Sequence, residues 1–518
     1  MGREGGCNGH FRGSWRWCRG VLRTYVAFGC LAENKECSAR RQRQRRAKFC
    51  VAQSMPDEAQ SSLLATAGLE RLSSQLAQID IVAESSARKR TDFLSLLKEQ
   101  GLTALADRQA VANAVGKHLR AAAAPAAVAP ATIIGASDSR LFLSPLNWVR
   151  TNQYAITQSP GAYLKLAWTG GDAVELELDS RTMESKFMTL SCHMDGLPEQ
   201  SVLVPPGQVS ARLPLTHGAA SSQDAPQKEH TLLVRIRNSV QQLDRWGQGG
   251  GAAPASSLKL RCIHLPPGAV AVMPIVRPRR LLAFGCSITE GVCAGYRPDT
   301  GLRGGDLNVN DAAAAWVVAA AAKLDAEFGS VGFGRQGWCV AGNGGVPCFH
   351  MVGDEKASSS WRWMWRDQPR VFSKEPPEIV IVLHGTNDGL TGADGKMVGA
   401  SVCEWLLEAR KELGGECHLC ICIPFGGFGG SGNQPVGALS DGFAQYQRVA
   451  SSDKRAHLID LGESATFNLS KFNIVNGRYA PTRESCDGIH PTAERHRELG
   501  EALAERVEGI LRNFHYLD

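Results

Sequence analysis

Arg280-Leu281-Leu282-Ala283-Phe284-Gly285-Cys286-Ser287-Ile288-Thr289 decides the fold of the C-terminal half of this 518-residue sequence. The apolar run 280–284 is typical of a short buried strand, and residues 289–291 are typical of the turn that leaves it. Ser287 therefore lies where a buried strand gives way to a loop. A hydroxyl in that position is a candidate nucleophile.

Two later segments supply partners for this serine. Asn387 follows the apolar run 379–383, and Asp487-Gly488-Ile489-His490 lies close to the C-terminus. Serine, an asparagine amide, aspartate and histidine are the groups that acyl transfer needs as nucleophile, oxyanion donor, orienter and base. The sequence therefore predicts a site at which Ser287 attacks an ester carbonyl, His490 takes its proton and Asp487 orients His490.

The C-terminal part, from about Arg277 to the end, resembles the SGNH (GDSL-type) hydrolases in both the content and the order of these blocks. Ser287 stands in the first block, Gly337 best matches the second-block glycine, Asn387 stands in the third, and Asp487 and His490 form the D-x-x-H of the last. The resemblance implies an oxyanion hole made by the backbone N–H groups of Ser287 and Gly337 and by the amide of Asn387.

One residue departs from the family pattern. Cys286 stands where an aspartate usually precedes the serine. Since that aspartate is a supporting residue in the family, the change bears on local hydrogen bonding more than on the nucleophile.

Each of these residues also has a simpler interpretation. Ser287 alone could cap a turn, and Asn387-Asp388-Gly389 and Asp487-Gly488 are common turn sequences. Four blocks in the correct order favour catalysis. His384, near Asn387, competes with His490 as a base but has no aspartate close by, so we expect it to line the pocket or the core. We expect Trp338, beside Gly337, to line the acyl or sugar subsite.

The same region alternates predicted strands and helices. This pattern indicates a parallel sheet with helices on both faces, on which functional residues gather at the carboxyl ends of strands. We expect strands near Leu281, Val331, Ile379, Leu419 and Leu458, separated by helices over 311–328, 397–413, 439–452 and 491–514.

Residues 133–274 have a different sequence pattern: short segments of alternating apolar and polar residues are separated by Gly, Pro, Asp and Ser. The segments 162–168, 173–178, 187–194 and 230–237 are typical of strands. Several strands in series without helices predict an antiparallel, jelly-roll-like sandwich. A sandwich directly before an SGNH domain is similar to the arrangement of the two-domain carbohydrate deacetylases, so the hydrolase domain is expected to span 275–518.

The N-terminal part is predicted to consist of a tail, a helical segment and a linker. Residues 1–55 are expected to be a basic disordered or targeting tail, and their pattern suits a transit peptide, a nuclear signal or a plain solvated stretch. Residues 56–120 are expected to be helical, with a faint resemblance to a SAM-type module that would mediate protein contact; a helical spacer is the alternative. Residues 121–132 are an Ala/Pro linker.

Charge and cysteine usage narrow the function further. Residues 1–50 carry 12 Lys/Arg and 3 Asp/Glu, so +9 of charge lies there and −3 of the total +6 falls to the remaining residues. The folded part is mildly acidic, which argues against nucleic-acid binding. Cys417-His418-Leu419-Cys420 lacks a second ligand pair for zinc and is expected to be a buried strand. We expect no cofactor, no metal ion and no transmembrane span.

The sequence therefore predicts a serine esterase that hydrolyses acyl esters, with acetyl esters of a carbohydrate as the expected substrates. The preference for a small acyl group and for a sugar rests on the family resemblance and the two-domain arrangement. A lipid or lysophospholipid esterase, or a thioesterase, is the alternative with the same chemistry. A catalytically weak glycan-binding or scaffold protein is the alternative of another class. The sequence leaves the compartment open.

Overall fold

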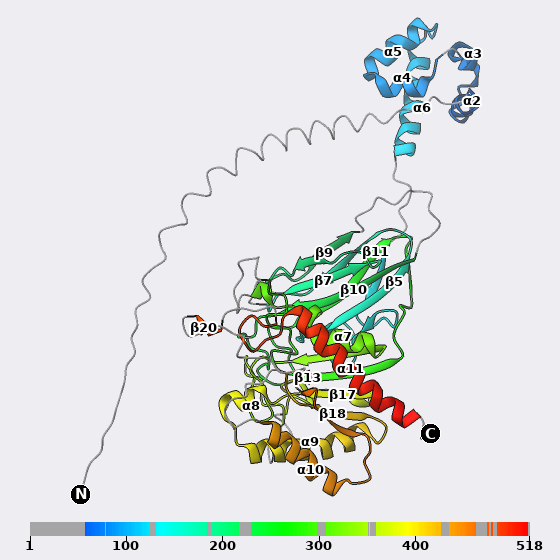
Figure 1. Ribbon diagram of the computed structural model, residues 1–518. Coiled ribbons are helices and arrows are strands. Elements are labelled where there is room, and N and C mark those ends of the chain that lie inside the picture. Colours follow the sequence, from blue (N-terminus) through cyan, green and yellow to red (C-terminus); the bar gives the residue numbers. More distant parts are fainter. Residues whose placement is uncertain are drawn as a thin grey trace, which may run out of the picture. The chain divides into compact units, whose positions relative to one another are not determined.

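A computed structural model of the chain separates it into two compact units, Met1–Val128 and Ala129–Asp518 (Figure 1). The predicted tail 1–55 and residues 124–130 of the predicted linker lie outside the described residues. The structure describes residues 57–77, 79–123, 131–183, 188–216, 229–297, 307–350, 352, 359–425, 435–462, 474–475, 478–479 and 484–515.

The first unit is helical. Its elements are α2 (Asp57–Thr66), η1 (Glu70–Leu72), α3 (Ser73–Leu76), α4 (Ile81–Ala87), α5 (Arg90–Glu99) and α6 (Leu105–Ala123). Asp80 caps α4 by accepting the N–H groups of Val82 and Ala83. Phe93, Leu97, Val111 and Val115, which recur at helical spacing, are buried together in its core.

Leu105 departs from that pattern. Its side chain is apolar but 54% exposed. It is the first residue of α6, where the chain enters the helix from the loop after Gly101. Helical periodicity does not fix the direction of a side chain at such an end.

The second unit begins with two antiparallel sheets that form a sandwich, as predicted. One sheet has the order β3-β4-β11-β6-β9, with β1 paired to β11, and the other has the order β12-β5-β10-β7-β8, with β2 paired to β5. The strands are β1 (Ala131–Gly135), β2 (Phe142–Leu143), β3 (Val149–Arg150), β4 (Ala155–Thr157), β5 (Tyr163–Thr169), β6 (Ala173–Leu178), β7 (Thr189–Met194), β8 (Gln200–Leu203), β9 (Ala211–Thr216), β10 (Glu229–Asn238), β11 (Leu258–Pro267) and β12 (Val270–Val272).

The core of the sandwich follows from alternation along its strands. On β6, Val174, Leu176 and Leu178 are buried while Glu175 and Glu177 face outward. The same alternation holds along β9. These two strands therefore give one apolar face to a shared core and one polar face to the surface.

A five-stranded parallel sheet follows the sandwich, with the strand order β14-β13-β17-β18-β19. Its strands are β13 (Arg279–Gly285), β14 (Ala326–Gly332), β17 (Ile379–Leu383), β18 (His418–Cys422) and β19 (Ala456–Ile459). Figure 1 places helices on both sides of it. This is the predicted α/β fold, and its chain order reverses beside β13, the position at which such sheets bind ligands.

Neighbouring residues of each strand face opposite helical layers. Leu281 and Ala283 pack on the side of α7 (Trp316–Lys323) and α11 (Ala493–His515). Leu282 and Phe284 pack on the side of α9 (Gly395–Leu413) and α10 (Pro435–Val449). Because both faces are buried, the strands carry continuous apolar runs instead of alternating ones.

The helix that we predicted over 311–328 is much shorter. A 3-10 turn, η4 (Ala312–Ala314), precedes α7, which ends at Lys323, and the last residues of the predicted helix belong to β14. Asp325 turns the chain with a left-handed backbone, at φ 48°. Alanine-rich sequence favours a helix locally, but pairing of β14 with β13 and burial of Phe328 override that preference.

The sandwich packs directly against the edge strand β14. The Tyr163 hydroxyl of β5 bonds Glu327 Oε2 at 2.5 Å and accepts the N–H of Phe328 at 3.0 Å, and Lys165 reaches Glu327 Oε1 at 2.5 Å. The remaining elements are η3 (Leu307–Val309), β15 (Trp363–Trp365), β16 (Gln368–Pro369), η5 (Phe372–Lys374), α8 (Thr386–Thr391), β20 (Ile474–Val475) and β21 (Arg478–Tyr479). Among the described helices, none combines the length and apolar character needed to cross a membrane.

Candidate active site

Ser287 stands two residues beyond the end of β13. The turn that follows is closed by the N–H of Glu290 on the carbonyl of Cys286 and by the N–H of Val292 on the carbonyl of Ser287, both at 3.0 Å. A Cβ on Gly285 would lie 2.0 Å from Thr289 Oγ1, so only glycine allows the turn to fold back onto the strand. The tight turn presents Ser287 at the carboxyl end of the sheet.

His490 and Asp487 come from the loop before α11. Asp487 Oδ1 accepts the N–H groups of Ile489 and His490, each at 2.9 Å. Ser485 Oγ accepts the N–H of Gly488 at 2.9 Å and donates to the carbonyl of His490 at 2.8 Å. The loop is thus held by its own side chains, which fixes the position of the imidazole.

The structure brings three predicted residues into one hydrogen-bonded chain. His490 Nε2 lies 2.8 Å from Ser287 Oγ, and His490 Nδ1 lies 2.7 Å from Asp487 Oδ2. With its proton on Nδ1, the imidazole donates to the carboxylate and leaves Nε2 to accept the serine hydroxyl. Ser287 and His490 are 203 positions apart in sequence, and the fold brings them into contact.

Asp487 also controls the charge of the imidazole. Burial lowers the pKa of His490, but the hydrogen bond that its ring donates to Asp487 and the negative charge of Asp487 outweigh burial and raise that pKa above the ordinary value. The pKa of Asp487 moves the other way: burial raises it, and the bonds to His490 lower it below the ordinary value overall. The carboxylate therefore stabilises the imidazolium that forms when His490 takes a proton.

The candidate oxyanion donors flank Ser287. Gly337 follows β14 and Asn387 follows β17, the two strands that pair with β13 on either side. Asn387 Nδ2 donates to the carbonyl of Gln336 at 3.0 Å, which links the two loops. One amide hydrogen of Asn387 is used in that bond, and the second remains to meet an oxyanion.

Asp388 fixes the loop that contains Gly337. Its carboxylate accepts the N–H groups of Trp338 and Cys339, both at 2.9 Å. A Cβ on Gly337 would lie 2.3 Å from Asp388 Oδ2, so this close approach requires glycine. The N–H of Gly337 donates to the carbonyl of Val340 at 2.9 Å, so an oxyanion would share this donor with the loop.

Trp338 does not lie where we expected it, and His384 lies in the core, one of the two places expected for it. Their side chains are 0% and 1% exposed, and both pack in an aromatic cluster with Phe349 and Trp405. Burial lowers the pKa of His384 to about 3, so the ring is neutral. The prediction that Trp338 lines the acyl or sugar subsite is wrong for this structure, because the loop after β14 folds Trp338 back into the core.

Cys286 fits its surroundings as a neutral thiol. It is buried in an apolar cluster with Ile288, Trp316 and Phe425, and burial raises its pKa. A carboxylate at this position would need polar partners, whereas a thiol packs as a small apolar group. The change from the family pattern therefore removes a buried charge and leaves the Ser287 turn intact.

Sequence reasoning missed a buried ion pair under the Ser287 turn. The carboxylate of Glu290 accepts hydrogen bonds from Nη1 of Arg245 and from Nε2 of Gln241, both at 2.5 Å. Gln241 and Arg245 belong to the segment that leaves the sandwich strand β10. No sequence motif links these residues, which stand 45 and 49 positions from Glu290.

Cys293 was missed as well. Its Sγ lies within 4.8 Å of donor atoms of Asp487 and His490, and its side chain packs against Cys486. A cysteine six positions after the predicted nucleophile gives no sequence signal by itself. It places a thiol next to the hydrogen-bonded chain.

A family model for the GDSL-like lipase/acylhydrolase family matches residues 283–498. Residues 283–498 form a GDSL-like acylhydrolase domain. The protein is accordingly a hydrolase of carboxylic esters. No curated protein matches the sequence.

Solved structures share the fold of the sandwich and the acylhydrolase domain together. A family two carbohydrate esterase from Cellvibrio japonicus is similar at 15% identity with a TM-score of 0.55, over 74% of this chain and 98% of its own. A family two carbohydrate esterase from Clostridium thermocellum, in complex with cellohexaose, matches at 15% identity and a TM-score of 0.52, over 72% and 99%. An acetyl xylan esterase from Butyrivibrio proteoclasticus matches at 15% identity and a TM-score of 0.52, over 74% and 98%.

Proposed function

We propose that this protein removes short acyl groups, above all acetyl, from a carbohydrate through a serine acyl-enzyme. The observation that carries the mechanism is the hydrogen-bonded chain from Asp487 through His490 to Ser287, with bonds of 2.7 and 2.8 Å. Each ring nitrogen of the histidine has one partner, which is the arrangement a general base needs.

The reaction follows from these contacts. Ser287 Oγ attacks the ester carbonyl carbon while His490 Nε2 takes the hydroxyl proton, which gives a tetrahedral oxyanion. The N–H groups of Ser287 and Gly337 and the free amide hydrogen of Asn387 stabilise that oxyanion. The imidazolium returns its proton to the leaving alcohol, and the acyl group stays on Ser287. Water then attacks the acyl-enzyme in the same way and releases the acid.

The carbohydrate and the acetyl group are supported by similarity of architecture. The structures with the same two-part fold are described as carbohydrate esterases, one of them as an acetyl xylan esterase. Lipid and thioester substrates are the alternatives with the same chemistry.

Acyl-chain preference tests the substrate class. We expect kcat/KM for p-nitrophenyl esters to fall at least about tenfold from acetyl to octanoyl, because each methylene that a small pocket rejects costs roughly 1–3 kcal/mol. The protein should also release acetate from acetylated xylan. A rate that stays flat or rises with chain length would contradict the deacetylase and favour the lipid esterase. The Ser287→Ala variant gives the background rate for every ester.

The pH dependence tests the coupling of His490 to Asp487. His490 must be neutral to accept a proton, and its pKa is raised, so kcat/KM should fall as the pH drops through a value above about 6.5. In Asp487→Asn the hydrogen bond and the negative charge that raise the pKa of His490 are lost, while burial remains. The fall in kcat/KM should therefore occur at lower pH. The measurement is the p-nitrophenyl acetate rate against pH, corrected for buffer hydrolysis. If kcat/KM of the unaltered protein falls only below pH 6.5, this coupling is ruled out.

A further inference from the structure

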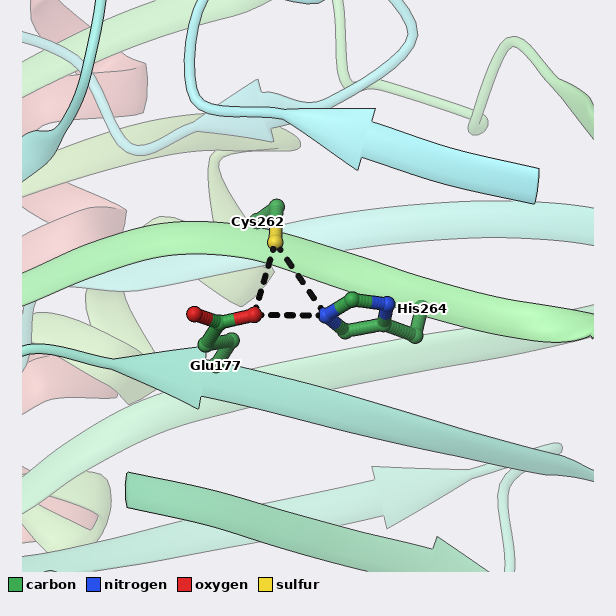
Figure 2. Close-up of side chains that lie close together, drawn as sticks. All are labelled: Glu177, Cys262 and His264. Atoms are coloured by element: carbon green, nitrogen blue, oxygen red, sulfur yellow. Dashed lines mark hydrogen bonds and ion pairs between the residues drawn. The ribbon is translucent and has the colours of Figure 1, made fainter. Parts of the chain in front are cut away.

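Three potential ligand atoms converge on the outward face of the sandwich. Glu177 Oε2, Cys262 Sγ and His264 Nε2 point at one another across strands β6 and β11, as Figure 2 shows. The pairwise distances are 2.7 Å from Glu177 to His264, 3.3 Å from Cys262 to His264 and 3.5 Å from Cys262 to Glu177. The three atoms thus form a small triangle.

A β-bulge turns two of these residues outward. The pairing of β11 with β6 shifts register between Leu260 and Cys262. Leu258 and Leu260 are buried before the shift, and Ile263 and Leu265 are buried after it. Without the extra residue, Cys262 and His264 would point into the core; with it they face outward together, with Glu177 opposite Cys262.

The bonding pattern differs from that of a proton relay. In a relay the imidazole uses its two nitrogens for different partners, as His490 does with Asp487 and Ser287. Here the thiol and the carboxylate both meet Nε2 of His264. Nε2 alone cannot take a proton from one of these groups and pass it to the other. A single cation, in contrast, could bind all three atoms at once.

The triangle is close to the size of one face of a tetrahedral zinc site. Zinc bonds of about 2.3 Å to sulfur and about 2.0–2.2 Å to nitrogen and oxygen put neighbouring ligands roughly 3.3–3.6 Å apart. Both distances from Cys262 Sγ match that range. Only the pair formed by His264 and Glu177, at 2.7 Å, must open, by roughly 0.6 Å.

A hydrogen bond from Ser210 orients the carboxylate of Glu177. Ser210 Oγ donates to Glu177 Oε1 at 2.9 Å, which leaves Oε2 for the triangle. Arg261 lies 4.0 Å from Oε1, and Arg212 lies 3.8 Å from Oε2. A dipositive ion bound to one thiolate and one carboxylate carries no net charge, so these two guanidinium groups need not be displaced. Hydrogen bonds of this kind to a ligand raise metal affinity.

The site has room for one more ligand. The side chains of His264 and Glu177 are 16% and 13% exposed, so the cluster is partly open to solvent. Gly135 of β1 stands opposite Cys262, and a Cβ added to it would meet no atom within 4 Å. Three protein ligands with one open, water-accessible position are a known zinc arrangement.

The geometry points to a divalent metal site for zinc at Glu177, Cys262 and His264, in the sandwich and separate from the acyl-transfer residues. Sulfur, imidazole nitrogen and carboxylate oxygen are the donor set that zinc takes, and calcium and magnesium avoid sulfur and nitrogen. The bound metal would join β6 to β11 and replace the bond between His264 and Glu177. No spacing in the sequence indicates this site, because Glu177 stands 85 positions from Cys262.

Cobalt substitution tests the site in the full chain. The protein is stripped with a chelator under a non-thiol reductant and titrated with Co²⁺ in place of Zn²⁺. We expect an intense near-ultraviolet thiolate-to-cobalt band at one equivalent, displaced by one equivalent of Zn²⁺. Cys262→Ser should lose the band, and His264→Ala should bind at least about tenfold more weakly, since loss of an outer-shell partner alone costs roughly 10–100-fold.

Two control variants separate this site from others. Cys293→Ser should keep the band, because Cys293 belongs to the cluster beside His490. Ser210→Ala should keep the band and bind about tenfold more weakly, since Glu177 loses its orienting bond. Circular dichroism checks that each variant is folded. Absence of the band in the unaltered protein, or its persistence in Cys262→Ser, would overturn the proposal. The cluster would then be a hydrogen bond between His264 and Glu177 beside a thiol that binds no metal.

Discussion

Replacing Ser287 with alanine should lower kcat for p-nitrophenyl acetate by about 10⁴-fold or more, to near the background rate. The reason is that the hydroxyl bonded to His490 at 2.8 Å is the only group in this hydrogen-bonded chain that can form the acyl-enzyme. The fold should be unaffected, because the backbone bonds that close the Ser287 turn do not involve its side chain. Initial rates with both proteins at one pH give the ratio.

Ser401→Ala is the matched control for this variant. Ser401 is a fully buried serine of the same domain, on α9, and its hydroxyl contacts Cys339. We expect this variant to retain activity within a few fold. If the unaltered protein and Ser287→Ala are equally inert, the chain is a binding or scaffold protein and not an esterase. If both are equally active, another group is the nucleophile.

The acylhydrolase fold could be predicted from sequence because its signals are local. Apolar runs such as 379–383 are short and continuous, which identifies strands buried on both faces. Ser287 and Asn387 each follow such a run directly, so their positions at the carboxyl edge followed from strand direction alone. His490 could be added because its partner Asp487 is only three positions away.

The environment of the site could not be predicted in the same way. Trp338 stands beside Gly337 in sequence, but whether it faces substrate or core depends on how the loop after β14 folds over Asp388 of α8, 50 positions away in sequence. The length of α7 depends on pairing of β14 with β13. Both outcomes are decided by tertiary contacts between residues far apart in sequence, which local propensity does not report.

Arg245→Met should destabilise the protein by about 3–5 kcal/mol, because it leaves Glu290 as an unpaired buried charge. The side chains of Arg245 and Glu290 are 0% and 3% exposed. Burial raises the pKa of Glu290 even with the arginine present, and loss of Arg245 should raise it further. Activity should fall as well, since Glu290 is part of the turn that carries Ser287. Thermal unfolding at several pH values measures the deficit.

The pH series separates loss of charge pairing from loss of packing. A carboxyl whose pKa is raised in the folded state destabilises that state when ionised, and this penalty disappears as the pH falls through its folded pKa. The deficit of Arg245→Met should therefore shrink from pH 8 to pH 5. The double variant Arg245→Met, Glu290→Gln should recover part of the stability at pH 8, because no buried charge remains. A deficit that is the same at every pH, and is not reduced by the second change, would mean that Arg245 acts through its packing on Phe333 and its bonds to Gly332 and Gln158 instead of through Glu290.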